Sequence, residues 1–184
     1  EGLGAEGPNP YLVGPSEGRS MLDAARAASR VKGSGVRETS PVLLWGFSQG
    51  GHAAAFAGEL APSYAPELDL RGVAMAAPVS NVAHFARRSE TWPAQMGVLV
   101  SIVHGFSSAY PDLDPHDVLS FEALEDLGQL EQLCVSEVNV LYDRPVEETL
   151  RRSPMDLPDW AERLEESRAG RNPIRVPMLV IQGD

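Results

Sequence analysis

The serine at position 48 stands in a pattern typical of an enzyme nucleophile. Gly46, Ser48 and Gly50 form the motif G-x-S-x-G within LLWGFSQGGH. In a nucleophile elbow a buried strand runs into a sharp turn that carries the serine, and a helix follows at once. Small residues two positions on either side of the serine avoid a collision across this strained turn. Residues 42–45 form an apolar run too short for a helix, and residues 49–60 are rich in alanine. The motif and its flanks therefore predict that Ser48 attacks a carbonyl carbon in acyl transfer.

The residue after the serine is the second candidate for catalysis. Gln49 opens the predicted helix, so its backbone N–H and the positive end of the helix dipole lie beside the charge that develops during attack. We therefore expect the amide of Gln49 to donate to the oxyanion. The alternative is a glycine-rich turn between a strand and a helix that has no catalytic role.

The four histidines do not fit the general base of a triad. His52 lies one helical turn after Ser48, whereas a base reaches the hydroxyl from a loop above it, so we predict a packing or hydrogen-bonding role for His52. His84, His104 and His116 precede the place where the acid is expected in the chain order Ser, Asp, His. One of these three acting as the base stays an alternative. Since there is no C-x-x-C and no H-x-x-x-H spacing, no metal site is predicted.

Composition limits the class of protein and of partner. The 184 residues, 43% hydrophobic and 22% charged, are ordinary for a globular domain. A net charge of −11 makes nucleic acid a poor partner, because each phosphate needs a cation. Residues 112–148 hold eleven acids against one base, which indicates a solvated helical surface, with a cationic partner as the alternative. Leucines within 119–133 predict one amphipathic helix there. Cys134, the single cysteine, is expected to be a buried small hydrophobe or half of a disulfide outside this segment.

Strands and helices that position the motif alternate along the chain. A helix is predicted after a cap at Ser20, strands at 42–45, 70–76 and 178–181, and a helix over 49–60 that Pro62 closes. This order predicts an α/β fold with a mostly parallel sheet and helices on both faces. Residues 83–170 carry helical patterns and form a cap insertion over the carboxyl edge of the sheet. The predicted division is core 1–82, helical cap 83–170, and return to the core at 171–184.

The longest uncharged stretch, residues 91–111, is not predicted to span a membrane, because prolines, glycines and polar residues interrupt it. Its central part, residues 96–106, predicts a helix that is apolar nearly all round, mostly cap core with one or two side chains facing substrate. The chain opens on Glu1 without a visible signal peptide and ends soon after a buried strand. We therefore expect both ends to be cuts within a longer protein.

Four segments in order carry a family resemblance. They are EGLG at 1–4, PYLVGPSEGRSMLDAARAA at 10–28, WGFSQGGHAAAFAGELAPSYAPEL at 45–68 and AYPDL at 109–113. The chain resembles the bacterial secretory lipases of the α/β-hydrolase superfamily, a group related to the fungal lipase A type. The resemblance implies a secreted carboxylic-ester hydrolase with a Ser-Asp-His triad, no metal, no organic cofactor, and a helical cap over an acyl pocket.

Mapped onto this sequence, the family nucleophile is Ser48 and one oxyanion amide is that of Gln49. The second oxyanion residue of the family stands ahead of EGLG and would precede Glu1. The acid, commonly in a G-x-x-D turn, would follow Gly183 by three residues and lie beyond Asp184, with the histidine later still. The resemblance thus implies that residues 1–184 alone are inactive, while the whole protein hydrolyses acylglycerols or other lipid-like esters.

Two other functions remain open at this point. The same nucleophile would serve an acyltransferase that uses an alcohol acceptor, and a vestigial elbow would fit a non-catalytic binding module. The sequence leaves open the acyl-chain preference, contact with a lipid interface, and the oligomeric state.

Overall fold

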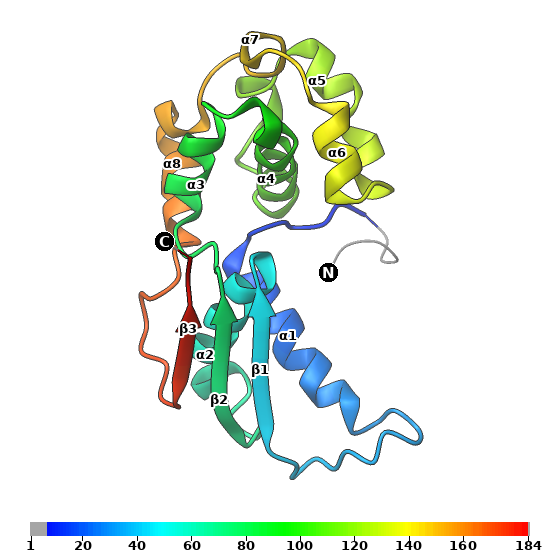
Figure 1. Cartoon of the computed structure of the whole chain (residues 1–184), viewed down its shortest axis with the longest axis vertical. Helices are drawn as coiled ribbons and strands as arrows, with labels where there is room; N and C mark the ends of the chain where they lie inside the picture. Colours follow the sequence, from blue (N-terminus) through cyan, green and yellow to red (C-terminus); the bar gives the residue numbers. More distant parts are fainter. Residues whose placement is uncertain (1–6, 184) are drawn as a thin grey trace. The chain divides into compact units, whose positions relative to one another are not determined.

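The computed structural model describes residues 7–183 and divides the chain into two compact units. The sheet unit comprises residues 14–80 and 168–183, and the helical unit comprises residues 7–13 and 81–167 (Figure 1). Of the predicted features, the EGLG segment at 1–4 and Asp184 lie outside the described residues. Assigning residues 83–170 as a cap over the active site stays a prediction.

A parallel three-stranded sheet forms the centre of the sheet unit. Its order is β1 (Val42–Phe47), β2 (Leu70–Ala76) and β3 (Met178–Ile181). The predicted strands at 70–76 and 178–181 are confirmed with the same bounds, but the last strand is exposed along its length rather than buried as expected. β1 is two residues longer than the predicted 42–45, because its pairing with β2 continues through Gly46 and Phe47. The residue after β1 is Ser48, so the serine lies at the carboxyl end of the first strand of the sheet.

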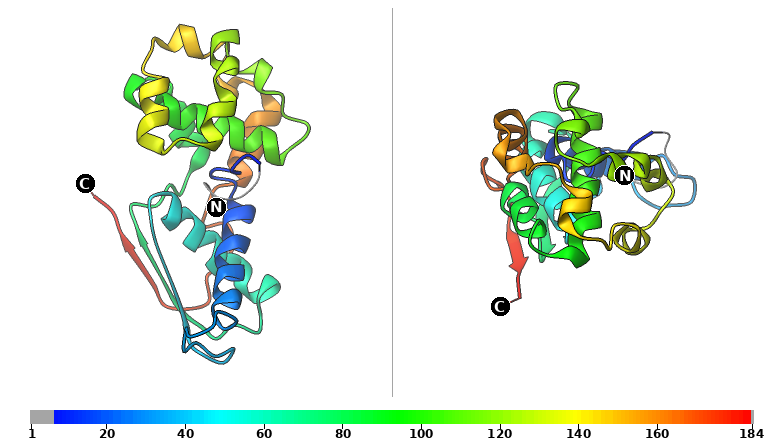
Figure 2. Two further views of the ribbon diagram at one scale, coloured as in Figure 1. Left: turned by 90° about the vertical axis from the view of Figure 1, so that its right-hand side faces the viewer. Right: turned by 90° about the horizontal axis from the view of Figure 1, so that it is seen from above.

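Two helices, α1 (Gly14–Ala28) and α2 (Gln49–Tyr64), lie on one face of this sheet (Figure 2). Alanines of α2 pack on Leu44, Val73 and Met75 in a common core. α1 packs against α2 so closely that a Cβ atom added at Gly18 would lie 2.9 Å from the backbone nitrogen of Ala57. Small side chains therefore set the distance between the two helices.

The bounds of both helices differ from the predicted ones. α1 begins at Gly14 rather than after Ser20, because Pro15 in the first turn needs no hydrogen-bond acceptor and has a backbone already suited to a helix start. α2 passes through Pro62 and ends at Tyr64. A proline this near the end of a helix removes only one backbone hydrogen bond. The last turn is also held from outside, because the guanidinium of Arg26 donates to the carbonyl of Tyr64 at 2.6 Å. Contacts with α1 thus allow α2 to continue past Pro62, where local helix propensity predicts that it ends.

The other face of the sheet carries exposed apolar side chains. Side chains alternate along a strand, so Leu44 and Gly46 face the helices whereas Leu43, Trp45 and Phe47 face away from them. The side chain of Trp45 is 68% exposed. Among the described residues of the sheet unit, no helix covers this face. Helices were predicted on both faces of the sheet, and in this unit they cover one face.

The helical unit is built around one buried helix. Its α-helices are α3 (Val82–Ser89), α4 (Met96–Ala109), α5 (Phe121–Glu125), α6 (Val135–Leu141), α7 (Val146–Thr149) and α8 (Pro158–Glu166), with 3₁₀ turns at Pro93–Gln95, Pro115–Asp117, Leu127–Glu131 and Pro154–Asp156. α4 confirms the predicted apolar helix, and Met96, Leu99, Ile102 and Phe106 are fully buried. In the described part of the chain, no helix combines the length and the apolar character needed to cross a bilayer.

In the acidic stretch, the predicted single helix is wrong, and one of the two alternatives for Cys134, the buried one, is excluded. Residues 119–133 form α5 and a 3₁₀ turn rather than one amphipathic helix, because Leu119 pairs with Leu150 in an isolated bridge and Ser120 starts a new helix by capping Ala123 N–H. Cys134 is a free, exposed cysteine rather than a buried one. It precedes α6, and its backbone N–H donates to the carboxylate of Glu137 at 2.8 Å. Local capping bonds therefore decide where these helices begin.

The contact at Gly18 yields a stability test. Gly18→Val places two methyl groups against the backbone of α2, so we expect a loss of roughly 1–3 kcal/mol in the free energy of unfolding. The matched control is Ala24→Val at an exposed position of the same helix, where only helix propensity changes, by about 0.5 kcal/mol. Urea unfolding followed by circular dichroism measures both. Equal losses in the two variants would contradict the close approach of α1 and α2.

Candidate active site

Ser48 occupies a strained turn between β1 and α2. Its backbone has φ 53° and ψ −117°, a conformation that residues with a side chain rarely adopt and that costs about 1–3 kcal/mol. Ser48 stands at the N-cap of α2, yet its hydroxyl makes no capping hydrogen bond. The residue is partly exposed. Its hydroxyl is thus held at a fixed point of the backbone without being used to stabilise the helix.

Gly46, two residues before the serine, leaves the space that this turn requires. A Cβ atom at Gly46 would collide with the backbone carbonyl of Gly50 and would lie 2.6 Å from the nitrogen of Gly51. At Gly50 an added Cβ meets nothing within 4 Å among the described residues. We expected both glycines to avoid a collision across the turn, and this holds for Gly46 but not for a side chain at position 50. The collision falls at Gly46, because β1 passes directly beneath the backbone of the first turn of α2.

The end of β2 also fixes the turn. The backbone N–H of Ser48 donates to the carbonyl of Ala76 at 2.9 Å. Gly51 lies against Pro78, whose Cα would be 3.1 Å from an added Cβ. Ala77, between these two contacts, also has a positive φ of 42°. The serine therefore sits where two neighbouring parallel strands end, which is the edge at which open α/β sheets bind ligands.

Gln49 is the first residue of α2, as predicted. A backbone N–H at this position has no acceptor within its own helix, so it is available to a group bound beside Ser48. The side chain of Gln49 points elsewhere: its Nε2 donates to Oε1 of Glu17 at 2.7 Å. The backbone and the side chain of Gln49 can therefore play separate parts.

His52 is buried and bound to the same glutamate. Its side chain is 0% exposed, and its Nδ1 lies 2.7 Å from Oε2 of Glu17. The ring also packs on Phe56 with 4.8 Å between centroids. These contacts confirm the predicted packing and hydrogen-bonding role of His52.

Sequence reasoning missed Glu17. This glutamate is 3% exposed and lies on α1 between Gly14 and Gly18, two glycines that contact Phe56 of α2. An acidic residue within a row of very small residues is the signal that could have identified it. The small residues mark the buried face of the helix, and a buried carboxylate requires donors.

The three other histidines belong to the helical unit. His84 is exposed on α3, and His116 is exposed with its Nδ1 2.7 Å from Asp114, two residues earlier in the chain. His104 on α4 is half-buried, and this burial lowers the pKa of its imidazole. The pair of His116 and Asp114 is a local cap of a 3₁₀ turn rather than a buried dyad. Among the described residues, no group of three or more His, Cys, Asp or Glu side chains is placed to hold a metal ion.

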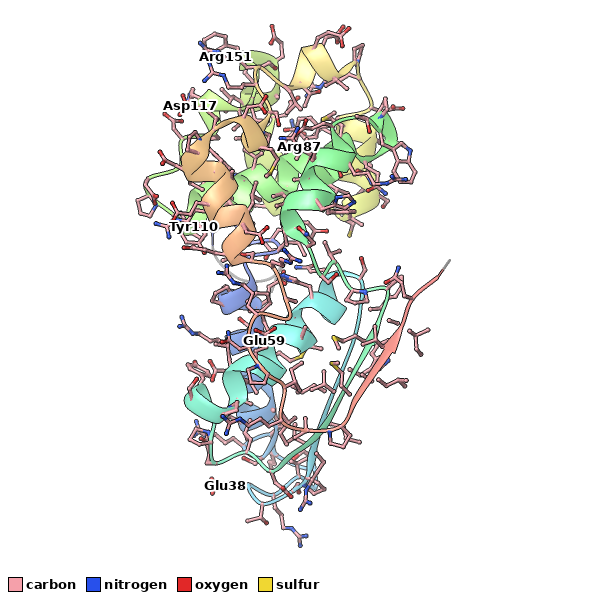
Figure 3. The ribbon with its side chains drawn as sticks, turned by 90° about the vertical axis from the view of Figure 1, so that its left-hand side faces the viewer. Glu38, Glu59, Arg87, Tyr110, Asp117 and Arg151 are labelled. Carbon is pink, nitrogen blue, oxygen red and sulfur yellow. The ribbon has the colours of Figure 1, made fainter. Side chains whose placement is uncertain are left out.

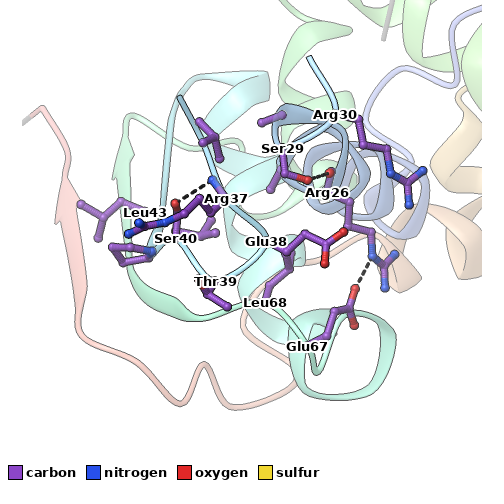
Figure 4. Close-up of a pocket in the computed structure, with 15 residues that line it drawn as sticks. Arg26, Ser29, Arg30, Arg37, Glu38, Thr39, Ser40, Leu43, Glu67 and Leu68 are labelled. Carbon is purple, nitrogen blue, oxygen red and sulfur yellow. Dashed lines mark hydrogen bonds and ion pairs between the residues drawn. The ribbon is translucent and has the colours of Figure 1, made fainter. Parts of the chain in front are cut away.

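A pocket of about 650 Å³ lies at the opposite end of β1 (Figure 4). Its walls are the end of α1, the loop over residues 29–41 and the start of β1. Arg26 in its wall is already paired with Asp23 and Glu67. Because β1 is six residues long, this pocket is separated from Ser48 by about 20 Å. It is therefore not part of the elbow site.

A second buried acid, Glu59, fixes the chain that returns to β3. Its side chain points from α2 toward this segment (Figure 3) and is 8% exposed. Its two carboxylate oxygens accept from the backbone N–H groups of Gly170 and Asn172 at 2.6 and 3.0 Å. Sequence reasoning did not single out Glu59 either. Glu59 lies in the second half of α2, about three turns away from Ser48.

Comparisons with known proteins agree on one family. The model of the family described as secretory lipase matches residues 4–148. Lipase 7 of Candida albicans is 31% identical over 157 residues, which cover 79% of this chain and 36% of that protein. A probable inactive lipase of Mycobacterium tuberculosis is 29% identical, with 96% of this chain and 41% of that protein covered. The chain thus spans about two fifths of the length of these relatives.

Solved structures support the fold. Lipase A of Candida antarctica superposes with a TM-score of 0.74 at 24% identity, covering 94% of this chain and 42% of that one. The rice cell wall degrading esterase LipA of Xanthomonas oryzae gives 0.69 at 17% identity, covering 96% and 51%. Together with the parallel sheet and its helices, this likeness confirms the predicted α/β-hydrolase fold.

The two glycines of the motif provide a matched pair of variants. Gly46→Ala drives a methyl group into the carbonyl of Gly50, so we expect loss of the folded elbow and a fall of several degrees in the melting temperature. Gly50→Ala places the same methyl group in open space within a helix, so we expect a melting temperature equal to or above that of the unmodified chain. Thermal unfolding measures both. Similar destabilisation by the two changes would show that the collision is not at Gly46.

Proposed function

Because this chain belongs to the secretory lipase family, we propose that it forms part of a carboxylic-ester hydrolase in which Ser48 is the nucleophile. The observation that carries the proposal is the backbone of Ser48, whose φ of 53° is a strained conformation in a non-glycine residue. Such strain persists where the surrounding structure enforces it, and it is common at active sites.

The proposed reaction follows from the position of the hydroxyl and of the first amide of α2. The Oγ atom of Ser48 loses its proton to a base and forms a bond to the ester carbonyl carbon. The carbonyl oxygen becomes an oxyanion, which accepts a hydrogen bond from the N–H of Gln49. The ester C–O bond then breaks, the alcohol leaves with the proton, and water releases the acyl group as a carboxylic acid by the same steps. Gly46 serves this chemistry by leaving room for the backbone of Gly50 in the first turn of the helix that carries the amide.

The general base is proposed to lie outside the sheet unit as described. His52 is the single histidine in residues 14–80 and 168–183, and its Nδ1 is bound to the buried carboxylate of Glu17. The resemblance of the motif to lipases implies an acid and a histidine that follow residue 184 in the natural protein, in the order Ser, Asp, His.

The proposed substrates are acylglycerols or other lipid-like esters, and the proposed location is outside the cell. The family is described as secretory, and the relatives reported above include proteins named lipase and esterase. The proposed chemistry uses protein groups alone, with no metal and no organic cofactor. Residues 83–170 are proposed to act as the cap over the acyl site.

A non-catalytic module is the second candidate function. One relative that aligns with 96% of this chain is named a probable inactive lipase. The two candidates differ in one measurable property, the reactivity of Ser48. A fluorophosphonate labels an activated serine covalently and leaves an inert hydroxyl unmodified.

Replacement of the nucleophile tests the main proposal. In the complete natural protein that contains this chain, Ser48→Ala is expected to lower ester hydrolysis by roughly 10³-fold or more, with the melting temperature little changed, because the hydroxyl makes no capping bond. Turnover of p-nitrophenyl esters and labelling by a fluorophosphonate are the measurements. Comparable turnover by the alanine variant would refute Ser48 as the nucleophile.

Residues 1–184 expressed alone are expected to show no appreciable esterase turnover. They supply the nucleophile and one oxyanion amide, while the proposed base and acid are contributed by other parts of the natural protein. Without a base, a serine hydroxyl stays neutral and is a weak nucleophile near pH 7. The segment and the complete protein should be titrated side by side with a fluorophosphonate and a p-nitrophenyl ester. Full labelling and undiminished turnover in the segment would identify one of its own four histidines as the base.

A further inference from the structure

One buried carboxylate on α1 contacts the first turn of the helix that follows the serine. Glu17 is 3% exposed, and each of its two oxygens contacts a residue of α2. Oε1 accepts from the side-chain amide of Gln49 at 2.7 Å, and Oε2 lies 2.7 Å from Nδ1 of His52. Gln49 and His52 are three residues apart, so they lie on the same side of the helix, one turn apart. A single side chain thus holds both ends of the first turn of α2.

The position of this carboxylate is itself fixed. The neighbouring residue, Gly18, lies against the backbone of Ala57, and Gly14 lies against the ring of Phe56. These contacts leave α1 no room to shift along α2 without a collision. Hydrogen bonds to a charged group in a buried setting are short and strong, and replacing such an acceptor leaves its donors unsatisfied. The bonds from Glu17 therefore fix the rotation and the tilt of the first turn.

We propose that Glu17 is a positioning residue for the ester hydrolysis proposed above, on which this inference rests. By holding the side chain of Gln49 and the ring of His52, Glu17 keeps the backbone N–H of Gln49 directed at the place where the oxyanion forms. Glu17 itself touches neither substrate nor the reacting atoms. Its effect passes through the orientation of one amide.

The kinetic signature of this role differs from that of a general stabilising contact. The bond between the amide and the oxyanion exists in the tetrahedral state and is weak or absent with the ground-state ester. A misdirected amide therefore lowers kcat while KM changes little. It also weakens the binding of a boronic acid, which forms a tetrahedral adduct with the serine hydroxyl and mimics that state. A merely structural contact would lower the amount of folded enzyme and leave both quantities unchanged for the molecules that fold.

The chain contains a matched control for Glu17. Glu59 is also a buried glutamate that accepts from several donors, among them the backbone N–H groups of Gly170 and Asn172. It lies on α2 itself, ten residues beyond Gln49, and its donors belong to the segment that leads to β3. Glu59→Gln therefore removes a comparable buried carboxylate without touching the first turn of α2.

The experiment compares three variants in the complete natural protein. Glu17→Gln keeps the size of the side chain but leaves one acceptor oxygen where two are needed. Gln49→Met removes the donor side chain, keeps the backbone amide and leaves Glu17 bound to His52, so it serves even if Glu17→Gln folds poorly. Glu59→Gln is the control. For each folded protein, kcat and KM for a p-nitrophenyl ester, the dissociation constant of an alkylboronic acid and the melting temperature are measured.

We expect Glu17→Gln and Gln49→Met each to lower kcat about tenfold, a part of what losing an oxyanion donor costs, with KM within about twofold. The boronic acid should bind more weakly by a similar factor. The double variant should be no worse than the poorer single variant, because both changes break the same link. Glu59→Gln should lower the melting temperature and leave kcat and boronic acid binding unchanged.

The outcomes separate this inference from the proposed function. If Glu17→Gln and Gln49→Met match Glu59→Gln in kcat and in boronic acid binding, the positioning role is overturned while Ser48 hydrolysis stands. If the unmodified protein shows no turnover and no labelling at Ser48, the proposed function and the inference both fail.

Discussion

The whole site depends on one close contact between backbones: β1 passes at Gly46 directly beneath the backbone of Gly50. Any side chain at position 46 would abolish this contact. This contact allows the chain to reverse direction within one residue, and Ser48 takes up the resulting strain in its own φ and ψ angles. The cost, about 1–3 kcal/mol, is local, whereas the packing that offsets it is distributed along α2. Alanines of α2 bury against Leu44, Val73 and Met75, and β1 is paired with β2 as far as the residue before the serine. The strained turn persists because the elements on both sides of it are fixed independently.

Small residues continue this close packing away from the turn. Gly18 of α1 approaches the backbone at Ala57, and this short distance brings the carboxylate of Glu17 within reach of the first turn of α2. Larger side chains at the same contact would separate the helices and leave a buried acid without its donors, which is costly. Glu59, in the second half of α2, holds the segment that returns to β3. α2 is thus fixed at its first turn by the buried carboxylate of Glu17 and farther along by its own Glu59, and alanines pack between these two places.

The sequence predicted the parts of this arrangement that depend on local pattern. The strands at 70–76 and 178–181 and the turn at Ser48 follow from short, largely apolar runs and from one motif. The parts that depend on tertiary contacts could not be predicted from the sequence. α2 passes Pro62 because Arg26 of α1 binds the carbonyl of Tyr64, and that pairing spans 38 residues of sequence. The roles of the two motif glycines look equivalent in the sequence, since only the path of β1 beneath α2 shows which one would collide. Leucine spacing over 119–133 predicted one helix, but the bridge between Leu119 and Leu150 and the cap at Ser120 divided that stretch.

The contacts of His52 bear on which part of the protein would supply the general base of the proposed reaction. A histidine four residues after Ser48 invites assignment as the base of the proposed reaction, yet its ring is fully buried and its Nδ1 is bound to Glu17. A base must take up a proton from Ser48 and give it to the leaving alcohol, so it needs access to the bound ester that a core position denies. His52 is the single histidine of the sheet unit in the described residues. Under the proposed function, this unit would therefore supply the attacking serine and one oxyanion donor, and the histidine that moves the proton would come from another part of the protein. The elbow could then be rigid, because the group that must approach and leave the substrate would lie on a different element.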